Sequence, residues 1–261
     1  MDNLAIKKAF VTGGSRGIGR GVVRMLSDEG YDIAFTYNSQ PEESETLKQE
    51  VEAKGRRCFF YQASLQNPGV AEDVTARAAA DLGGIDLLVC NAGRTRFNDL
   101  LTLDGELMDF LYNLNYRSYM MCAKTAANDM AARGAVGNII FIASTRGFRA
   151  YPEDAVYGGF KAALIRSVES MALDMAPHGI RVNCVAPGAT AVRGSFSEED
   201  LTRGYAKRIP LGRKGVPDEV GRLVRFIASD EAAYMTGNTV KLDGGLILPG
   251  MPERDDGWPS N

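Results

Sequence analysis

Three side chains in the middle of the chain, Ser144, Tyr157 and Lys161, have the types and spacing needed for acid–base chemistry. Tyr157 and Lys161 are four residues apart, so on a helix they would lie on one face, one turn from each other. An ammonium beside a phenol favours the ionised phenol, which lowers the phenol's pKa and helps it to transfer a proton near neutral pH. Ser144 follows the apolar run 139–142, at a strand end where open α/β sheets carry their chemistry. The same Tyr–Lys spacing also occurs on ordinary amphipathic helices, so its interpretation depends on the rest of the chain.

Strand and helix patterns alternate along the sequence around these residues. Runs typical of buried strands occur at 7–12, 32–37, 57–62, 85–89, 139–143, 180–185 and 239–242, and helical patterns at 17–29, 42–54, 68–82, 104–132 and 154–176. This order predicts a single α/β domain of Rossmann type, doubly wound, with a mainly seven-stranded parallel sheet flanked by helices. We expect the catalytic domain to span 1–245, with an irregular, polar substrate segment at 188–215 and a tail at 246–261.

Composition excludes several classes of function. The 261 residues carry a net charge of −3 with a pI near 5.4, which gives no reason to expect nucleic acid or an anionic membrane as a partner. No apolar run approaches the length of a membrane-spanning helix, and the N-terminus lacks signal-peptide features. Four scattered cysteines predict reduced thiols in a cytoplasmic protein. A single histidine, His178, argues against a metal site and against a Ser-His-Asp triad.

A glycine-rich turn joins the first predicted strand to the first predicted helix. It reads Thr12-Gly13-Gly14-Ser15-Arg16-Gly17-Ile18-Gly19. Glycines at such a turn let a pyrophosphate approach the backbone, and the helix N-terminus adds free amides and the positive end of a dipole. Such a turn alone is weak evidence, but its place between the first strand and first helix favours a dinucleotide site.

Together these motifs resemble the short-chain dehydrogenase/reductase superfamily over about residues 5–245. The glycine turn is similar to the family's T-G-x-x-x-G-x-G, and Ser144, Tyr157 and Lys161 have its catalytic spacing. The other motifs that carry the resemblance are Cys90-Asn91-Ala92-Gly93 (Cys in place of the first Asn of N-N-A-G), Asn115 in the fourth helix, Pro187-Gly188 with Thr190, and Met235-Thr236-Gly237 with Leu242-Asp243-Gly244-Gly245. Within the family, the pattern looks most similar to glucose-type sugar dehydrogenases and to 3-oxoacyl carrier-protein reductases.

The resemblance implies hydride transfer between a nicotinamide and a carbonyl or secondary alcohol. It implies that Tyr157 is the general acid/base, that Lys161 lowers the Tyr157 pKa and holds the nicotinamide ribose, that Ser144 binds the substrate oxygen, and that Asn115 keeps a water in a proton relay. The expected cofactor-binding residues are Gly13, Ser15, Arg16, Gly17, Ile18, Gly19, Tyr37, Asn38, Ser39, Ser64, Leu65, Asn91, Ala92, Gly93, Tyr157, Lys161, Pro187, Gly188 and Thr190. A non-catalytic NADP-sensing regulator on the same fold is the alternative class. Such a protein could lose Tyr157 or Lys161, and this chain keeps both.

Two features depart from the family pattern. Ser64 takes the place of an aspartate that contacts adenine, and its hydroxyl can still accept a hydrogen bond. Gly158 and Gly159 follow the tyrosine inside a predicted helix, at a cost of about 1 kcal/mol each relative to alanine. Close approach of the cofactor or of a neighbouring helix is one reason for such glycines.

NADP(H) is the expected cofactor, with NAD(H) as the second choice. NAD enzymes place an acidic residue at the end of the second strand, about twenty residues beyond the glycine turn, to bind the ribose hydroxyls. Here that strand ends in Tyr37, and no carboxylate there would repel a 2′-phosphate. Arg16 lies inside the glycine turn, where its guanidinium could pair with that phosphate.

The sequence does not determine the substrate. The expected substrate residues are Arg94, Arg96, Thr145, Arg146, Tyr151 and Arg193, and several arginines near one mouth would suit a polar or anionic compound or be solvated surface charges. We expect a sugar or polyol or a 3-oxoacyl-type compound, with a hydroxysteroid or small ketone as the alternative. We also expect self-association, because the predicted helices carry surplus apolar residues, and the resemblance implies that the assembly is a homotetramer. The tail, with Trp258, either docks on a neighbouring subunit or is frayed.

Overall fold

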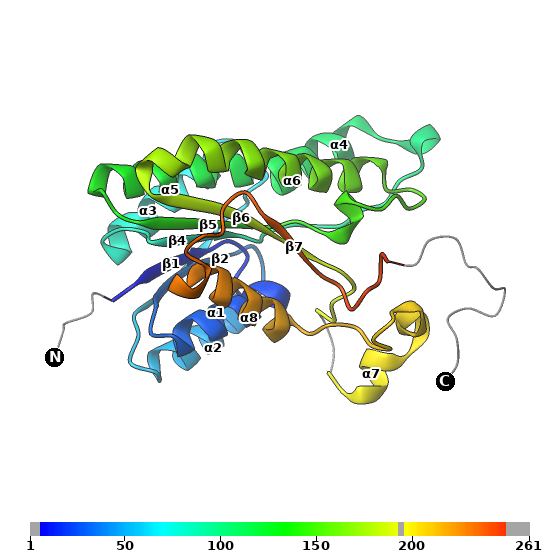
Figure 1. The fold of residues 1–261 in the computed structure, drawn as a ribbon, viewed down its shortest axis with the longest axis horizontal. Helices are drawn as coiled ribbons and strands as arrows, with labels where there is room; N and C mark the ends of the chain where they lie inside the picture. Colours follow the sequence, from blue (N-terminus) through cyan, green and yellow to red (C-terminus); the bar gives the residue numbers. More distant parts are fainter. Residues whose placement is uncertain (1–5, 193–195, 249–261) are drawn as a thin grey trace.

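Seven parallel strands form one sheet at the centre of the protein (Figure 1). The computed structural model describes residues 6–192 and 196–248. The strands are β1 (Lys8–Val11), β2 (Asp32–Tyr37), β3 (Cys58–Gln62), β4 (Leu87–Cys90), β5 (Gly137–Ile142), β6 (Ile180–Pro187) and β7 (Thr239–Leu242). Their order in the sheet is β3-β2-β1-β4-β5-β6-β7. The direction of the sequence reverses between β1 and β4, and the expected single α/β domain with a seven-stranded parallel sheet is confirmed.

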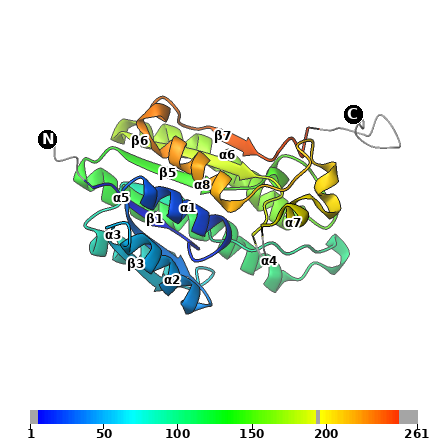
Figure 2. The same cartoon turned by 90° about the horizontal axis from the view of Figure 1, so that it is seen from below.

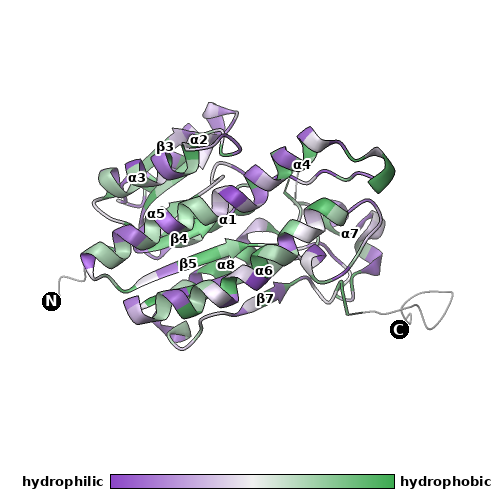
Figure 3. Cartoon of the chain, turned by 90° about the horizontal axis from the view of Figure 1, so that it is seen from above, coloured by the Kyte–Doolittle hydropathy of each residue, from purple (hydrophilic) through white to green (hydrophobic). Residues whose placement is uncertain are grey.

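Helices cover both faces of the sheet. They are α1 (Gly17–Asp28), α2 (Pro41–Glu52), α3 (Val70–Leu82), α4 (Gly105–Tyr112), α5 (Ser118–Arg133), α6 (Ala155–Met175), α7 (Glu198–Thr202) and α8 (Pro217–Ala228). Helices α1, α2 and α8 lie on the face seen in Figure 2, whereas α3, α4, α5 and α6 lie on the opposite face seen in Figure 3. Apart from α7, which lies in the segment 188–215, the protein is a three-layer sandwich, as expected when the strands have both faces apolar.

The hydrophobic core consists of two clusters, one on each face of the sheet. Phe141, Tyr119 and Leu164 belong to the cluster under α3, α5 and α6. Phe35 and Val224 belong to the cluster under α1, α2 and α8. Strand residues alternate between the two clusters, so a single apolar strand contributes to both cores. This burial fixes the carboxyl ends of the strands, from which the site residues extend.

The structure divides the helix expected at 104–132. Helix α4 ends at Tyr112, one π-helical turn follows at Asn113–Arg117, and α5 begins at Ser118. π-Helical turns frequently occur at functional sites, and this one carries Asn115.

The stretch after β6 is more regular than expected. Segment 188–215 contains α7 and a 3₁₀ turn at Gly204–Arg208, so describing the whole segment as irregular was wrong. Helix α8 was not expected, although Pro217 at its start, acidic residues in its first turn and the apolar residues Val220, Val224 and Ile227 are recognisable helix signals. No helix among the described residues is long and apolar enough to cross a membrane. The tail was expected at 246–261, and its residues 249–261, including Trp258, lie outside the described part.

The adjacent glycines of α6 differ in what surrounds them, and this predicts a difference in stability. A Cβ on Gly158 would lie 3.0 Å from the Arg146 carbonyl oxygen and 3.1 Å from Asp154 Oδ2, whereas a Cβ on Gly159 would meet nothing within 4 Å. Gly159→Ala should therefore raise the free energy of unfolding by about 0.5–1 kcal/mol, the ordinary helix gain. Gly158→Ala should gain less or lose, because its neighbours must shift. Denaturant unfolding of both variants beside the wild type measures this, and equal gains would contradict the packing described for Gly158.

Candidate active site

The structure brings Ser144, Tyr157 and Lys161 together at the carboxyl edge of the sheet. Ser144 lies two residues beyond β5, and Tyr157 and Lys161 lie on one face near the start of α6. The Lys161 ammonium is buried and donates a 3.0 Å hydrogen bond to the carbonyl oxygen of Ile142, the last residue of β5. It lies 5.7 Å from the centre of the Tyr157 ring. A phenol, a hydroxyl and an ammonium are thus held beside one strand end.

The pKa of Tyr157 is raised, and burial is the largest cause. Hydrogen bonding to Thr95 and Ser144 acts in the opposite direction, as does the charge of Arg146, whereas Asp154 raises the pKa further. The net direction is opposite to the lowered pKa that we expected beside Lys161, and the lowering by Lys161 itself stays a prediction. At neutral pH the phenol is protonated and can donate a proton.

Lys161 has its own pKa lowered to about 8, because burial disfavours the charged ammonium. The neighbouring thiols of Cys184 and Cys90 act on this pKa in the opposite direction. The Tyr119 ring lies 5.0 Å from Nζ, a distance at which the face of an aromatic ring attracts a cation. A lysine in these surroundings exchanges its proton close to neutral pH.

The Asn115 side chain holds the loop that follows β4. It is fully buried, its Oδ1 accepts a 3.1 Å hydrogen bond from the Arg94 amide, and its Nδ2 donates to the carbonyl oxygens of Arg94 and Leu111 at 3.1 and 3.2 Å. These contacts support the loop that leads from Gly93 into Arg94. The proton-relay role expected for Asn115 stays a prediction.

Backbone and hydroxyl groups hold the glycine turn against the turn after β4. Thr12 Oγ1 accepts hydrogen bonds from the amides of Asn91 and Ala92 at 2.9 and 3.0 Å, and Asn91 Nδ2 donates to the carbonyls of Thr12 and Gly13 at 3.0 Å. A Cβ on Gly19 would lie 2.1 Å from the Gly13 carbonyl oxygen, so only glycine fits there. No side chain caps α1, and no acidic residue lies in its first turn. An uncapped helix N-terminus behind a glycine turn fits a pyrophosphate.

The residues expected at the adenosine end also lie together. Tyr37 ends β2 and packs against Phe60, and the Ser64 hydroxyl donates to Asn38 Oδ1 at 3.2 Å. Asn38 and Ser39 are exposed, whereas Leu65 is buried in the core, so its side chain does not face the site. The Arg16 guanidinium reaches across from the glycine turn and donates to Gln40 Oε1 at 3.2 Å.

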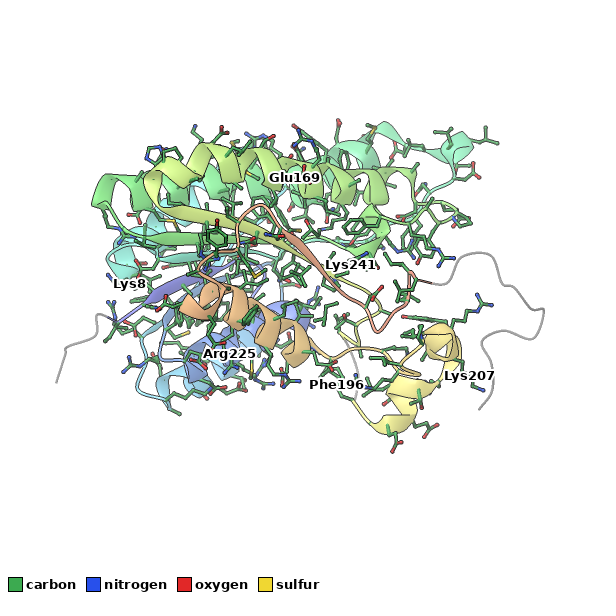
Figure 4. All side chains as sticks on the ribbon, viewed as in Figure 1. Lys8, Glu169, Phe196, Lys207, Arg225 and Lys241 are labelled. Atoms are coloured by element: carbon green, nitrogen blue, oxygen red, sulfur yellow. The ribbon has the colours of Figure 1, made fainter. Side chains whose placement is uncertain are left out.

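The segment after β6 reaches the same edge. Pro187 ends β6, the Gly188 amide donates to the Leu242 carbonyl at 2.9 Å, and Thr190 forms a bridge with Gly215. Phe196 and Lys207 lie farther along this segment (Figure 4). A Cβ on Gly17 would lie 3.2 Å from Val192, so the start of the segment lies over the glycine turn.

The residues expected to bind substrate do not form one group. Arg94 and Arg96 are exposed, Thr145 is buried, and Arg193 lies outside the described residues. Arg146 pairs with Asp154 at 2.8 Å. Tyr151 and Arg146 line an open groove of about 600 Å³ beside the start of α6, but Ser144, Tyr157 and Lys161 do not line it. This groove is therefore not the place where a substrate would meet Tyr157.

Sequence reasoning missed several residues that shape the site. Thr36 holds the glycine turn by accepting from the Gly13 amide at 2.9 Å, and Thr95 bonds to the Tyr157 phenol. Phe97 lies edge-on to Tyr157, with ring centres 6.4 Å apart. Asp154 three residues before Tyr157 was a visible signal, because a carboxylate so near a proposed proton donor affects its pKa.

A glycine turn, an uncapped first helix and a Ser-Tyr-Lys group on one edge of a parallel sheet define a nicotinamide-dependent oxidoreductase of Rossmann type. The family model described as enoyl-(acyl carrier protein) reductase matches residues 13–247. The chain belongs to the short-chain dehydrogenase/reductase family. Members of this family are NAD(P)-dependent oxidoreductases that act on CH–OH groups, and this protein is one of them.

Individual relatives match nearly the whole chain. The 3-oxoacyl-[acyl-carrier-protein] reductase FabG of Staphylococcus aureus is 35% identical over 244 residues, which are 93% of this chain and 98% of that protein. Among solved structures, acetoin dehydrogenase from Enterobacter cloacae is 31% identical with a TM-score of 0.92, covering 97% of this chain and 100% of its own. A short-chain dehydrogenase/reductase from Serratia marcescens is 31% identical with a TM-score of 0.83, covering 92% and 97%.

The lowered pKa of Lys161 predicts how stability depends on pH. The pKa falls from 10.5 in the unfolded chain to about 8 in the folded one, so between these values the unfolded state binds more protons and stability rises with pH. Relative to Lys161→Met, the wild type should gain up to about 3 kcal/mol of unfolding free energy from pH 7.5 to 10.5. Denaturant unfolding of both proteins across this range measures the gain, and a constant difference would show that the ammonium is not desolvated.

Proposed function

We propose that this protein is an NADP(H)-dependent carbonyl reductase that interconverts a ketone and a secondary alcohol, with a 3-oxoacyl-type compound as its substrate. The observation that carries the proposal is the meeting of Ser144, Tyr157 and Lys161 at the end of β5, on the same edge of the sheet as the glycine turn. Near full-length similarity to a 3-oxoacyl-[acyl-carrier-protein] reductase supports the substrate class.

In the reductive direction Tyr157 donates its phenolic proton to the substrate oxygen, and the nicotinamide supplies the hydride when bound. The raised pKa of Tyr157 supports this role, because the phenol is protonated at neutral pH. Ser144 Oγ, beside the phenol, orients the substrate oxygen. Lys161, with its pKa near 8, is a proton-exchanging group next to Tyr157 and positions the nicotinamide ribose. Asn115 fixes the loop that borders the site.

A small neutral ketone is a second candidate substrate. The observation in its favour is the pairing of Arg146 with Asp154, which removes one of the cations expected to attract an anionic substrate. Structural similarity to acetoin dehydrogenases supports the same candidate. A sugar or polyol and a hydroxysteroid are the other candidate substrates, and they are tested in the same assay.

The first test of the proposed function is the variant Tyr157→Phe. It should lower turnover by about 100-fold or more while NADPH binding changes little, because only the proton donor is lost. Oxidation of NADPH is followed with 3-oxoacyl thioesters, small ketones, sugars and steroids as substrates, and NADPH affinity is measured by fluorescence. Wild-type turnover in Tyr157→Phe would remove this residue from the mechanism, and no turnover of any substrate by the wild type would favour a regulator.

The NADP(H) preference rests on the groups around the end of β2. Tyr37, Asn38, Ser39 and Gln40 carry no carboxylate, and exposed Arg16 donates a hydrogen bond to Gln40. A guanidinium at this place can form charge-assisted hydrogen bonds to a 2′-phosphate. Glu42 and Glu43 in the first turn of α2 are the nearest acids along the chain, and they follow Pro41 rather than ending the strand.

The variant Arg16→Ala tests this preference. It should weaken NADPH binding by roughly 1.5–3 kcal/mol, the value of a charged hydrogen bond, and leave NADH binding nearly unchanged. Arg166→Ala is the matched control, because Arg166 is an exposed arginine on α6. Titration of both cofactors measures the effect. A wild type with the higher kcat/KM for NADH, or an equal loss of both cofactors in Arg16→Ala, contradicts the proposal.

We also propose a cytoplasmic homotetramer in which the catalytic domain spans 1–245. Tyr112, Tyr116 and Phe160 form an aromatic cluster between α4 and α6, and Met108 and Tyr112 remain partly exposed. Exposed apolar and aromatic side chains on one face favour association. Four buried free cysteines agree with a reducing compartment. Light scattering at micromolar concentration checks the assembly, and a monomer would contradict it.

A further inference from the structure

We infer that Arg146 and Asp154 act as a positioning pair for Tyr157, tying the start of α6 to the two loops that flank it. The inference rests on the proposed function, because it assigns the pair to the tyrosine of that mechanism. It replaces the expected contact between Arg146 and substrate.

The ion pair itself is mostly desolvated. Arg146 Nη1 lies 2.8 Å from Asp154 Oδ2, and the side chains are 30% and 2% exposed. Asp154 immediately precedes α6, but its carboxylate forms no capping bond to that helix. The carboxylate is instead directed to Arg146, in the loop after β5. Removing one member of such a pair leaves a buried charge without compensation, so the two segments are held in one arrangement.

Two aromatic rings enclose the guanidinium of Arg146. Its Cζ lies 4.3 Å from the centre of the Phe97 ring and 4.4 Å from the centre of the Tyr151 ring. Both distances suit cation–π contacts. Phe97 also meets the Tyr157 ring edge-on, at 89° between the ring planes. The guanidinium therefore joins the loop after β4, the loop after β5 and, through Phe97, the phenol ring of Tyr157.

The backbone around the pair also holds the two loops together. The Asn98 amide donates to the Glu153 carbonyl at 2.9 Å, which joins the same two loops. Glu153 has a φ of 60°, a left-handed conformation that is unusual for glutamate and persists only where its surroundings impose it. Gly158 leaves the space in which the Arg146 carbonyl and the Asp154 carboxylate approach α6. A solvated surface arginine would need none of these features.

The pair also sets the electrostatic surroundings of Tyr157. Asp154 raises the pKa of the phenol and Arg146 lowers it, so their effects oppose each other. The other polar groups that face Tyr157 are the hydroxyls of Thr95 and Ser144, the Lys161 ammonium and the buried phenol of Tyr119. Removing only Arg146 should make the phenol harder to ionise, and removing only Asp154 should make it easier.

The experiment measures the pH dependence of kcat for alcohol oxidation, in which ionised Tyr157 accepts the proton. Arg146→Met should move the profile to higher pH and Asp154→Asn should move it to lower pH. The double variant R146M/D154N should return close to the wild-type profile. Arg146→Lys should keep the profile but lower kcat, because an ammonium keeps the charge and cannot stack as a planar group between Phe97 and Tyr151. Arg166→Met is the control and should match the wild type.

The same variants separate positioning from substrate binding. In Arg146→Met, kcat at pH 7 should fall by about tenfold or more, while the KM for substrate stays within about twofold. A raised KM for substrate with unchanged kcat would show that Arg146 contacts the substrate and would overturn the inference. Profiles of the single variants that do not move in opposite directions would also overturn it.

Two of the variants, the double variant and Tyr157→Phe, keep the inference testable if a single variant fails to fold or if the enzyme uses another proton donor. The double variant contains no unpaired buried charge, so it reports on the pair even if a single variant fails to fold, and a displaced profile in the folded double variant would count against the inference. Tyr157→Phe separates the two levels of the proposal. If that variant stays active, the proposed function fails. If it is inactive while Arg146→Met and Asp154→Asn keep wild-type kinetics, only the positioning role fails.

Discussion

The hydrogen bond from the buried Lys161 ammonium to the Ile142 carbonyl is the interaction on which the site depends. A desolvated ammonium is costly unless it is well paired, and here a strand-end carbonyl and the Tyr119 ring are its partners. The bond fixes the start of α6 against the end of β5, and that placement brings Tyr157, one helical turn earlier, beside Ser144. Burial also lowers the pKa of Lys161. The burial that positions the start of α6 therefore also sets the protonation behaviour of this lysine.

Much of the fold is predictable from local patterns, because buried strands and amphipathic helices differ in period along the chain. Helix α8 was absent from the sequence prediction. It has ordinary helix start signals, but its sequence follows a polar segment and has a short apolar face. The π-helical turn at Asn113–Arg117 is less accessible to sequence reasoning. It occurs where the buried Asn115 amide bonds to a loop some twenty residues earlier, and no local propensity encodes that contact.

The candidate site also has features that the sequence predicts and features that only the structure shows. Motif spacing is sufficient to place Ser144, Tyr157 and Lys161 together, because the strand end and one helix face determine their positions. The direction of the Tyr157 pKa was not predictable from spacing, since burial is its largest cause, and hydrogen bonding to Thr95 and the charge of Asp154 come next. The partners of Arg146 were equally hidden. Phe97 comes from the loop after β4, and only the tertiary structure shows that it stacks on this guanidinium.

Arginine illustrates why residue type alone does not identify a binding site. Arg16 is exposed and its described partner is the neutral Gln40 amide, so its charge is left for an anionic ligand. Arg146 is the same residue type near the same edge of the sheet, but the Asp154 carboxylate and two aromatic rings already satisfy it. Electrostatic attraction to a ligand depends on charge that has not been neutralised within the protein. The arginines around the mouth therefore do not form one anion site. Among the described residues Arg16 has no carboxylate partner, whereas the charge of Arg146 is paired with Asp154.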